Sequence, residues 1–177
     1  MTAPVGTLPF TSEQSDNIER DVIKMIRNTV KELGQDWKIS SSISLSTLFE
    51  NNTVAYKNNG KSTQIKPDGG MLLYKNKPVA LFEVKYQKAK ANACERVFKY
   101  LPILIKNNIP FRNFIAVFDG PAFQKNNVGH ITSQPGATYM MLEQCGCSVY
   151  NANHDTNLAD KIKENILQIV KDTECSM

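Results

Sequence analysis

Three charged residues, Asp68, Glu83 and Lys85, are spaced so that two carboxylates could hold a metal ion with an ammonium group beside it. Asp68 lies in the run Pro67-Asp68-Gly69-Gly70, and 14 residues separate it from Glu83, which is enough for a strand, a turn and a returning strand. Side chains alternate across a strand, so Glu83 and Lys85 point to one face and Val84 points to the other. The spacing therefore predicts that two carboxylates and an ammonium group meet at one end of a sheet.

Two carboxylates beside an ammonium group suit reactions at phosphorus. Carboxylate oxygens are hard ligands suited to Mg²⁺, which keeps several waters of its own. A metal ion there lowers the pKa of bound water, and a neighbouring lysine can position that water and stabilise developing charge. The alternative interpretation is an Asp in a turn followed by a Glu–Lys pair on an exposed strand. The apolar surroundings of Glu83 favour the metal site, because charges without a partner are costly there.

The elements around these residues alternate between strands and helices. The expected hairpin has strands at Met71–Tyr74 and Val79–Tyr86, joined by a turn at residues 75–78. Other expected elements are a helix from Thr11 or Ser12 to near Gly34, a short strand or helix within 37–49, a helix from Asn92 with an apolar face at Ala93, Val97, Leu101 and Leu104 and a kink or second start at Pro102, a strand Phe111–Phe118, a helix Ala137–Leu142, a strand Cys147–Tyr150, and a helix Leu158–Val170 capped by Asp155 or Thr156. This order predicts an α/β fold with a central mixed β-sheet flanked by helices.

Three motifs between residues 65 and 120 resemble those of EcoRI- and MunI-like type II restriction endonucleases, a branch of the PD-(D/E)xK nuclease superfamily. The run Ile65-Lys66-Pro67-Asp68-Gly69-Gly70 is similar to the metal-site motif of that family. Ala91-Asn92-Ala93-Cys94-Glu95-Arg96 resembles its GNAxER recognition motif, and residues 114–120 look like its apolar strand ending in Glu-Gly or Asp-Gly. The motifs occur in the family's order, so the resemblance implies a restriction-endonuclease-like core.

The resemblance also implies an activity, namely Mg²⁺-dependent hydrolysis of double-stranded DNA at a short palindrome by a homodimer. Asp68 and Glu83 would hold the metal with the carbonyl of Val84, and Lys85 would orient the attacking water. Bases would be read from the major groove and phosphates contacted nearby. The residues implied for these DNA contacts are Asn92, Ala93, Glu95 and Arg96 for bases, and Lys88 and Lys90 for phosphates.

The link between Lys85 and Asn92 bears on the length of the target. Enzymes with the GNAxER motif resemble one another in reading an AATT core, and a long segment before the motif helps EcoRI contact the outer bases. Here only the six residues 86–91 form that link, and its lysines and alanines offer little discrimination between bases. We therefore predict the target AATT, cut to leave a four-nucleotide 5′ extension. Ala91 stands where the family motif has Gly, and its side chain would hinder a close approach of the backbone to DNA there.

Composition and charge are compatible with such an enzyme. The 177 residues predict a single domain with a loose tail at residues 1–10, and the net charge is +4. Residues 61–99 carry nine basic and three acidic side chains, as expected for phosphate contacts, although a solvated lysine-rich surface explains the same pattern. No run of apolar residues has transmembrane length, and the four cysteines form no CxxC pair. We expect a cytoplasmic protein of a prokaryotic host with free thiols and no membrane partner.

Two other functions remain open at this point. A structure-specific nuclease, such as a junction resolvase or repair nuclease, would share the metal motif but would not need the motif at Asn92–Arg96. A DNA-binding module with an inactive site is the other alternative, and the intact Asp68, Glu83 and Lys85 argue against it. Glu19 on the first helix is a candidate fourth active-site residue, although a solvated helix face is the simpler interpretation. His130 and His154 receive no catalytic role.

Overall fold

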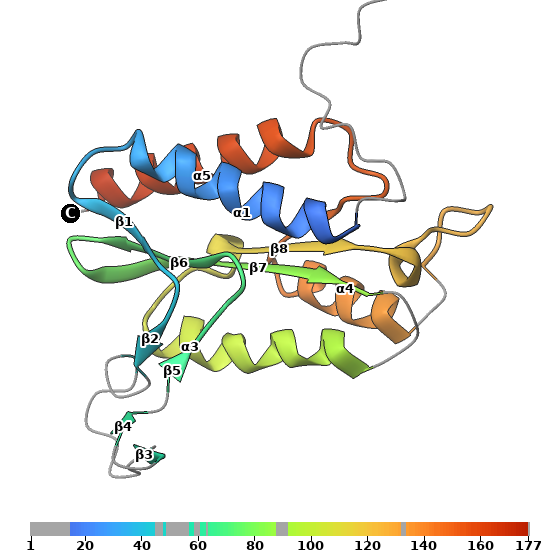
Figure 1. Ribbon diagram of the computed structural model, residues 1–177, viewed down its shortest axis with the longest axis horizontal. Helices are drawn as coiled ribbons and strands as arrows, with labels where there is room; N and C mark the ends of the chain where they lie inside the picture. The colour runs from blue at the N-terminus through green and yellow to red at the C-terminus, as the bar shows by residue number, and fades with distance from the viewer. Residues whose placement is uncertain are drawn as a thin grey trace, which may run out of the picture.

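The computed structural model of the chain describes residues 15–44, 48, 57–58, 61–62, 64–87, 92–131 and 134–176, and for some of them, including 92–95, it describes the backbone alone. Helices and strands alternate along much of this length (Figure 1). In chain order the elements, with η for 3-10 helices, are α1 (Ser15–Lys31), β1 (Trp37–Ser40), β2 (Ile43–Ser44), β3 (Lys57–Asn58), β4 (Lys61–Ser62), β5 (Gln64–Ile65), β6 (Gly70–Tyr74), β7 (Lys77–Tyr86), η1 (Asn92–Tyr100), α3 (Leu101–Lys106), η2 (Phe111–Asn113), β8 (Phe114–Asp119), η3 (Pro121–Phe123), α4 (Gln134–Gln144), β9 (Ser148–Asn151) and α5 (Leu158–Cys175).

The central sheet has five strands in the order β1-β6-β7-β8-β9. The pairs β1–β6 and β6–β7 are antiparallel, whereas β7, β8 and β9 run parallel to one another. The predicted α/β fold with a central mixed sheet flanked by helices is therefore confirmed. The parallel strands are joined through helices, as parallel pairs require. The strand β7 lies between an antiparallel and a parallel neighbour, so it is fixed from both sides.

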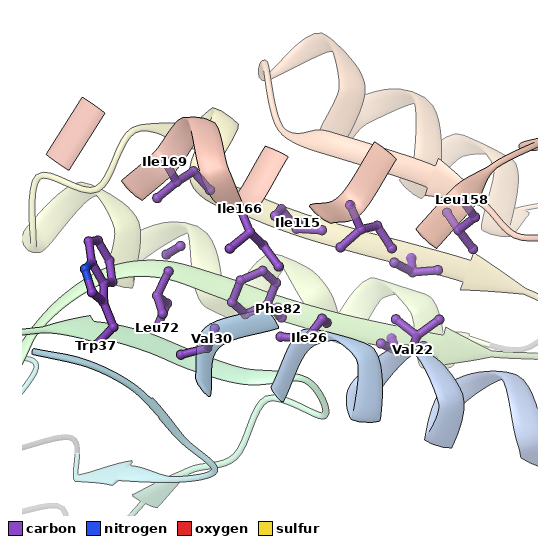
Figure 2. Close-up of a cluster of buried hydrophobic side chains, with 14 of the residues drawn as sticks. Val22, Ile26, Val30, Trp37, Leu72, Phe82, Ile115, Leu158, Ile166 and Ile169 are labelled. Carbon is purple, nitrogen blue, oxygen red and sulfur yellow. The ribbon is translucent and has the colours of Figure 1, made fainter. Parts of the chain in front are cut away.

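Helices α1 and α5 cover one face of the sheet, which we call the α1/α5 face (Figures 1 and 2). Residues four apart on each helix share one side, and this spacing gives each helix a buried apolar stripe. Full burial of such a side chain contributes about 1.5–3 kcal/mol. The residues packed between the helices and the sheet include Ile18, Val22, Ile26 and Val30 of α1, Ile162, Ile166 and Ile169 of α5, and Leu72, Phe82, Val84, Ile115 and Val117 of the strands.

The other face of the sheet, which we call the η1/α3 face, is covered by η1, α3 and α4 (Figure 1). The strand residues that point to this face are the alternate ones, as the period of two requires. The second core contains Met71, Leu73, Leu81, Phe114, Ala116 and Phe118 from the sheet, and Val97, Tyr100, Ile103, Leu104 and Leu142 from the helices. Leu81 belongs to this face, so Glu83 and Lys85, two and four residues later on β7, point to the same side.

The hairpin turn between β6 and β7 is shorter than the sequence analysis predicts. Lys75 and Asn76 form it alone, with φ of 47° and 68°. Two positive φ angles in a two-residue loop match the twist of the flanking strands, and Asn tolerates this conformation well. The prediction of a turn through Pro78 is wrong, because Pro78 lies within β7, opposite Leu73.

The segment after Asn92 also departs from the prediction. It is a 3-10 helix up to Tyr100 and becomes an α-helix only from Leu101. Pro102 lies in the first turn of α3, where its missing N–H has no helical partner to lose, so it marks the predicted second start. The strand predicted from Phe111 begins at Phe114 instead, after the short helix η2.

The start of the last helix differs from the prediction as well. Asn157, with φ of 56°, precedes α5 and makes no side-chain cap, so neither Asp155 nor Thr156 has the capping role. Asp155 instead accepts hydrogen bonds from the Asn151 N–H (2.6 Å) and from Lys161 Nζ (3.0 Å). It therefore connects the loop before the helix to the Lys161 side chain of α5 and does not cap the helix N-terminus.

Several other elements lie close to their predicted positions. The strand β1 falls within residues 37–49, α4 includes the predicted helix and is longer, and β9 is displaced by one residue. The predicted start of the first helix at Thr11 or Ser12 lies outside the described residues. Cys145 and Cys147 are free thiols, as is Cys175, and the side chain of Cys94 is not described. Within the described ranges, no helix combines the length and apolar character that crossing a membrane requires.

Candidate functional site

A tight turn at residues 67–70 brings Asp68 to β7. The Gly70 N–H donates to Pro67 O (3.0 Å), and the Gly69 N–H donates to Phe82 O (3.1 Å). A Cβ placed on Gly69 would lie 2.5 Å from Phe82 Cβ, so only glycine lets the turn approach the strand this closely. The turn thus holds Asp68 against the segment of β7 that carries Glu83.

The structure brings Asp68, Glu83 and Lys85 into direct contact, as the sequence predicts. The Lys85 Nζ lies 2.8 Å from Asp68 Oδ2 and 3.2 Å from Glu83 Oε1. The second oxygen of Glu83 accepts a hydrogen bond from the Asp68 N–H at 2.9 Å. The Glu83 side chain is 2% exposed, whereas those of Lys85 and Asp68 are 24% and 33% exposed. The buried Glu83 carboxylate therefore contacts the ammonium group of Lys85, which is itself partly exposed to solvent.

A β-bulge in the hairpin determines which face of the sheet carries this cluster. Leu73 pairs with Pro78 but Leu72 pairs with Ala80, so Val79 is an extra residue on β7. Without the extra residue, every later side chain of β7 would point to the opposite face. The bulge therefore directs the two charged residues of β7 to the η1/α3 face, while Val84 enters the core under α1 and α5.

Burial and charge act in opposite directions on the two ionisable groups of β7. Burial raises the pKa of Glu83, and the charge of Lys85 and the Asp68 N–H oppose that effect without cancelling it. Burial alone would lower the pKa of Lys85, but its hydrogen bond to Asp68 and the charges of both carboxylates raise that pKa above its ordinary value. Lys85 is therefore protonated at neutral pH and is held by the two carboxylates.

Tyr100 is a further residue of the cluster, and the sequence analysis did not select it. Its side chain is fully buried, and its ring packs edge-on against Phe114, with the ring centroids 5.8 Å apart. Burial, followed by the negative charge of Glu83, the closeness of the Glu83 carboxylate to the hydroxyl and the charge of Asp68, raises the pKa of Tyr100 far above its ordinary value, so its hydroxyl keeps its proton. That hydroxyl lies beside Glu83 without meeting hydrogen-bond geometry to it or to any other described group.

The donor set fits a divalent cation with oxygen ligands. Two carboxylates already share one positive charge, since the Lys85 ammonium bridges Asp68 and Glu83. Mg²⁺ is commonly held by one or two carboxylates and completes its shell with water. The described residues contain no group of three or more His, Cys, Asp or Glu side chains, which a structural zinc site would need. Asp68 and Glu83 could therefore hold Mg²⁺ once Lys85 moves aside.

The residues predicted to bind DNA are only partly described. Lys88 and Lys90 lie outside the described residues, and Asn92, Ala93 and Glu95 are described by their backbone in η1 alone. Arg96 is exposed on η1, four residues before the buried Tyr100. The helix predicted to read bases therefore begins just after the strand of the cluster and covers the same face of the sheet.

Glu19 is not brought to the cluster. It lies on α1, which packs on the α1/α5 face, whereas Glu83 and Lys85 point to the η1/α3 face. Glu19 lines a shallow surface depression with basic residues of its own helix, including Arg20, Lys24 and Arg27. His130 is exposed, and His154 Nε2 accepts a hydrogen bond from the Lys125 N–H at 3.0 Å. None of these contacts suggests a catalytic role.

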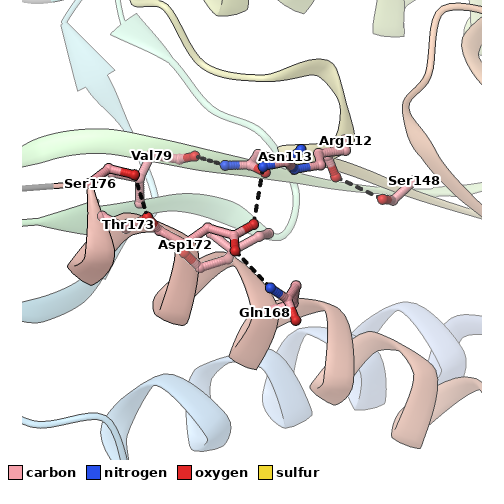
Figure 3. Close-up of polar contacts among 9 residues, drawn as sticks. Val79, Arg112, Asn113, Ser148, Gln168, Asp172, Thr173 and Ser176 are labelled. Atoms are coloured by element: carbon pink, nitrogen blue, oxygen red, sulfur yellow. Dashed lines mark hydrogen bonds and ion pairs between the residues drawn. The ribbon is translucent and has the colours of Figure 1, made fainter.

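A groove of about 690 Å³ lies at the other end of β7 and β8. Two contacts connect residues that line the groove. Asn113 Nδ2 donates to Val79 O (2.8 Å), and Arg112 forms an ion pair with Asp172 (3.1 Å) (Figure 3). Val79 and Lys85 are six residues apart on one strand, which places the groove about 20 Å from the cluster. We interpret the groove as a structural feature, at which the C-terminal end of α5 packs against the edge of the sheet.

Compared with known proteins, the chain matches no protein-family model and no curated protein. The likeness to restriction endonucleases therefore rests on three local motifs within residues 65–120. The first of these motifs forms the turn at Asp68, and the third forms strand β8, which pairs with β7. The geometry of Asp68, Glu83 and Lys85 stands independently of that likeness.

Replacing Lys85 with methionine should destabilise the metal-free protein and make it more responsive to Mg²⁺. The buried Glu83 carboxylate would lose its cation, at a cost of about 1–3 kcal/mol. That is less than for a fully buried pair, because Lys85 and Asp68 are partly exposed. Mg²⁺ can replace the lost charge, so it should raise the unfolding midpoint of the variant more than that of the wild type.

Thermal unfolding in EDTA and in millimolar Mg²⁺ measures both effects. Lys163→Met is the matched control, since Lys163 is half exposed and lies 4.0 Å from Glu32. Such an exposed pair contributes about 0–1 kcal/mol, so the control should behave like the wild type. Equal Mg²⁺ responses of the Lys85 variant and the wild type would show that Lys85 does not compete for the cation site.

Proposed function

We propose that this chain is a type II restriction endonuclease that hydrolyses double-stranded DNA with Mg²⁺. The observation that carries the proposal is the ammonium of Lys85 held between Asp68 and the buried Glu83, at 2.8 and 3.2 Å. A buried carboxylate kept beside a partly exposed Asp and Lys is costly for the fold, which suggests that the cluster has a function. The local resemblance at residues 65–120 supports a nuclease rather than another metal-dependent enzyme.

Each residue of the cluster has a defined part in this proposal. Asp68 and Glu83 would hold the metal ion, together with the carbonyl of Val84. When bound, the ion would lower the pKa of water and offset negative charge on the phosphoryl group. Lys85, released from the carboxylates, orients the attacking water and donates to the oxygen on which charge develops. The exposed fractions of Asp68 and Lys85 allow a phosphate to reach the two side chains that it must approach.

Sequence discrimination is assigned to the start of η1. Asn92 can pair with adenine, Glu95 can accept from an exocyclic amino group, and Arg96 can donate to acceptors on bases or phosphates. Ala93 lies between them, and Lys88 and Lys90 would contact phosphates, which position the protein without reading sequence. The exposure of Arg96 supports its availability to a duplex. The protein would work in the cytoplasm of a prokaryotic host.

The short link before η1 and the two-fold symmetry of a palindrome lead to one combined expectation. We expect a homodimer to cut both strands at AATT and to leave a four-nucleotide 5′ extension, because each copy reads one half of the site. Sequencing the ends of digested genomic DNA tests the target, and light scattering on a short cognate duplex tests the assembly. Fixed bases outside AATT, ends without AATT, or a protein that stays monomeric on the duplex would contradict this arrangement.

Three defined substrates separate this proposal from the alternatives. A plain duplex with AATT should be cut, a duplex with TTAA at the same place should not, and a four-way junction without AATT should not. Each mismatched base pair costs about 1–3 kcal/mol of discrimination, so the contrast should be large. Preferred cleavage of the junction would indicate a structure-specific nuclease. Binding without cleavage of any substrate would indicate an inactive DNA-binding module.

A further inference from the structure

The hydroxyl of Tyr100 is a buried donor that lacks a hydrogen-bond partner in the described part of the chain. The side chain is fully buried, so bulk water does not reach the hydroxyl. An unpaired buried hydroxyl is unfavourable to the folded state, and phenylalanine at this position would avoid that cost. The hydrophobic core therefore does not require the hydroxyl of Tyr100.

The ring of Tyr100 is fixed from two directions. Phe114 contacts its ring edge-on, with centroids 5.8 Å apart, and Lys99 Nζ lies 4.7 Å from the ring centroid. Phe114 pairs with Leu81 on β7, and Glu83 is the next residue of β7 on the same face. The ring thus packs on the face of the sheet that carries Glu83, and its hydroxyl is near enough for the Glu83 carboxylate to act on it.

The Glu83 carboxylate has room for a further donor. One oxygen accepts the Asp68 N–H at 2.9 Å, and the other contacts Lys85 Nζ at 3.2 Å. An ionised carboxylate offers about four acceptor sites, so these two donors leave it unsaturated. When a divalent cation takes the place of the ammonium group, Glu83 also loses the Lys85 contact and needs another group to fix its orientation.

We propose that Tyr100 is the positioning residue of Glu83, with its hydroxyl donating to the carboxylate when that carboxylate binds the divalent cation. The inference rests on the proposed metal site and adds a residue outside the three motifs. Groups that orient a metal ligand through a hydrogen bond commonly alter metal affinity by about 10–100-fold. Tyr100 acts through Glu83 and does not touch the substrate.

Titration of the DNA-free protein with Mn²⁺, used as a spectroscopic substitute for Mg²⁺, tests the inference. The variant Tyr100→Phe keeps the ring and removes only the hydroxyl, so we expect Mn²⁺ affinity to fall by about 10-fold or more. The thermal unfolding midpoint in EDTA should stay the same or rise, because an unpaired polar group is lost. A residue with a purely structural role would lower that midpoint and leave the Mn²⁺ affinity of the folded protein unchanged.

Tyr139→Phe is the matched control, since Tyr139 lies on α4 with its ring 5.8 Å from Phe118, in the same layer. It should bind Mn²⁺ like the wild type. Wild-type Mn²⁺ affinity in Tyr100→Phe, or a wild-type protein that binds no Mn²⁺, would overturn the inference. The titration contains no DNA, so a protein that fails to cut DNA but loses Mn²⁺ affinity in Tyr100→Phe would refute the nuclease proposal alone.

Discussion

Replacing Glu83 with glutamine should lower the rate of DNA cleavage by about 10⁴-fold or more, the scale on which loss of a central catalytic group acts. The variant keeps the shape of the side chain and an oxygen that can accept the Asp68 N–H. It loses the negative charge that would bind Mg²⁺. Cleavage of a labelled duplex under single-turnover conditions measures the effect, and DNA binding without divalent ions should be retained.

The same substitution should leave the fold intact. Burial raises the pKa of Glu83, so the ionised form is disfavoured in the folded state relative to the unfolded state. The contribution of Glu83 to the free energy of unfolding therefore becomes less favourable as the pH rises above the ordinary pKa of a glutamate. A neutral glutamine at this position has no such pH dependence. Lys85 keeps its contact with Asp68. We expect the unfolding midpoint of Glu83→Gln at neutral pH to equal or exceed that of the wild type.

The matched control for this experiment is Glu143→Gln, which changes an exposed residue on α4. Its cleavage rate should equal that of the wild type. Near wild-type cleavage by Glu83→Gln would show that this carboxylate does not hold the metal. Loss of cleavage together with a large loss of stability would point to a structural role instead.

Substituting Gly69 with alanine should reduce both stability and cleavage. The new Cβ would lie 2.5 Å from Phe82 Cβ and 3.0 Å from Phe82 O, so the turn or the strand must move. Overpacking of this kind costs about 1–3 kcal/mol. The movement would displace Asp68 from Glu83, and a misplacement of about 1 Å can lower a rate by about 10²-fold.

Urea unfolding and duplex cleavage measure the two effects of Gly69→Ala. Gly129→Ala is the control, because it adds strain at a φ of +83° with nothing within 4 Å of the new Cβ. It should cost about 1–2 kcal/mol and leave cleavage unchanged. If Gly69→Ala cleaves and unfolds like the wild type, the turn does not fix the position of Asp68.

The convergence of Asp68, Glu83 and Lys85 could be predicted from sequence because it depends on two local properties. A hairpin returns the chain to its starting point, and the period of a strand places alternate residues on one face. The order of helices and strands then predicts the mixed sheet. These properties are visible in hydrophobic pattern and turn residues alone.

The face to which the cluster points could not be predicted, because it depends on one extra residue in the pairing of β6 with β7. Pro78 was expected in the turn, since proline usually interrupts a strand. The structure instead places it in β7 next to the bulge at Val79. The actual turn uses only Lys75 and Asn76, and the bulge then reverses the direction of every later side chain of the strand.

Tyr100 was missed because its position beside Glu83 depends on tertiary packing that no local pattern predicts. The apolar face predicted for this segment contains Ala93, Val97, Leu101 and Leu104, and Tyr100, three residues after Val97, belongs to the same face. In a 3-10 helix residues three apart share one side, so Val97 and Tyr100 are both buried. The available signal was a tyrosine on an apolar helix face, because a buried tyrosine hydroxyl usually needs a hydrogen-bond partner.

Digestion of a plasmid by the wild-type protein, with Mg²⁺ and with EDTA, tests the central claim most directly. The proposed function predicts discrete linear fragments with Mg²⁺, all ending in the same short sequence, and intact plasmid with EDTA. An intact plasmid under both conditions, or equal cutting by the wild type and Glu83→Gln, would contradict the assignment of Asp68, Glu83 and Lys85 as a nuclease site.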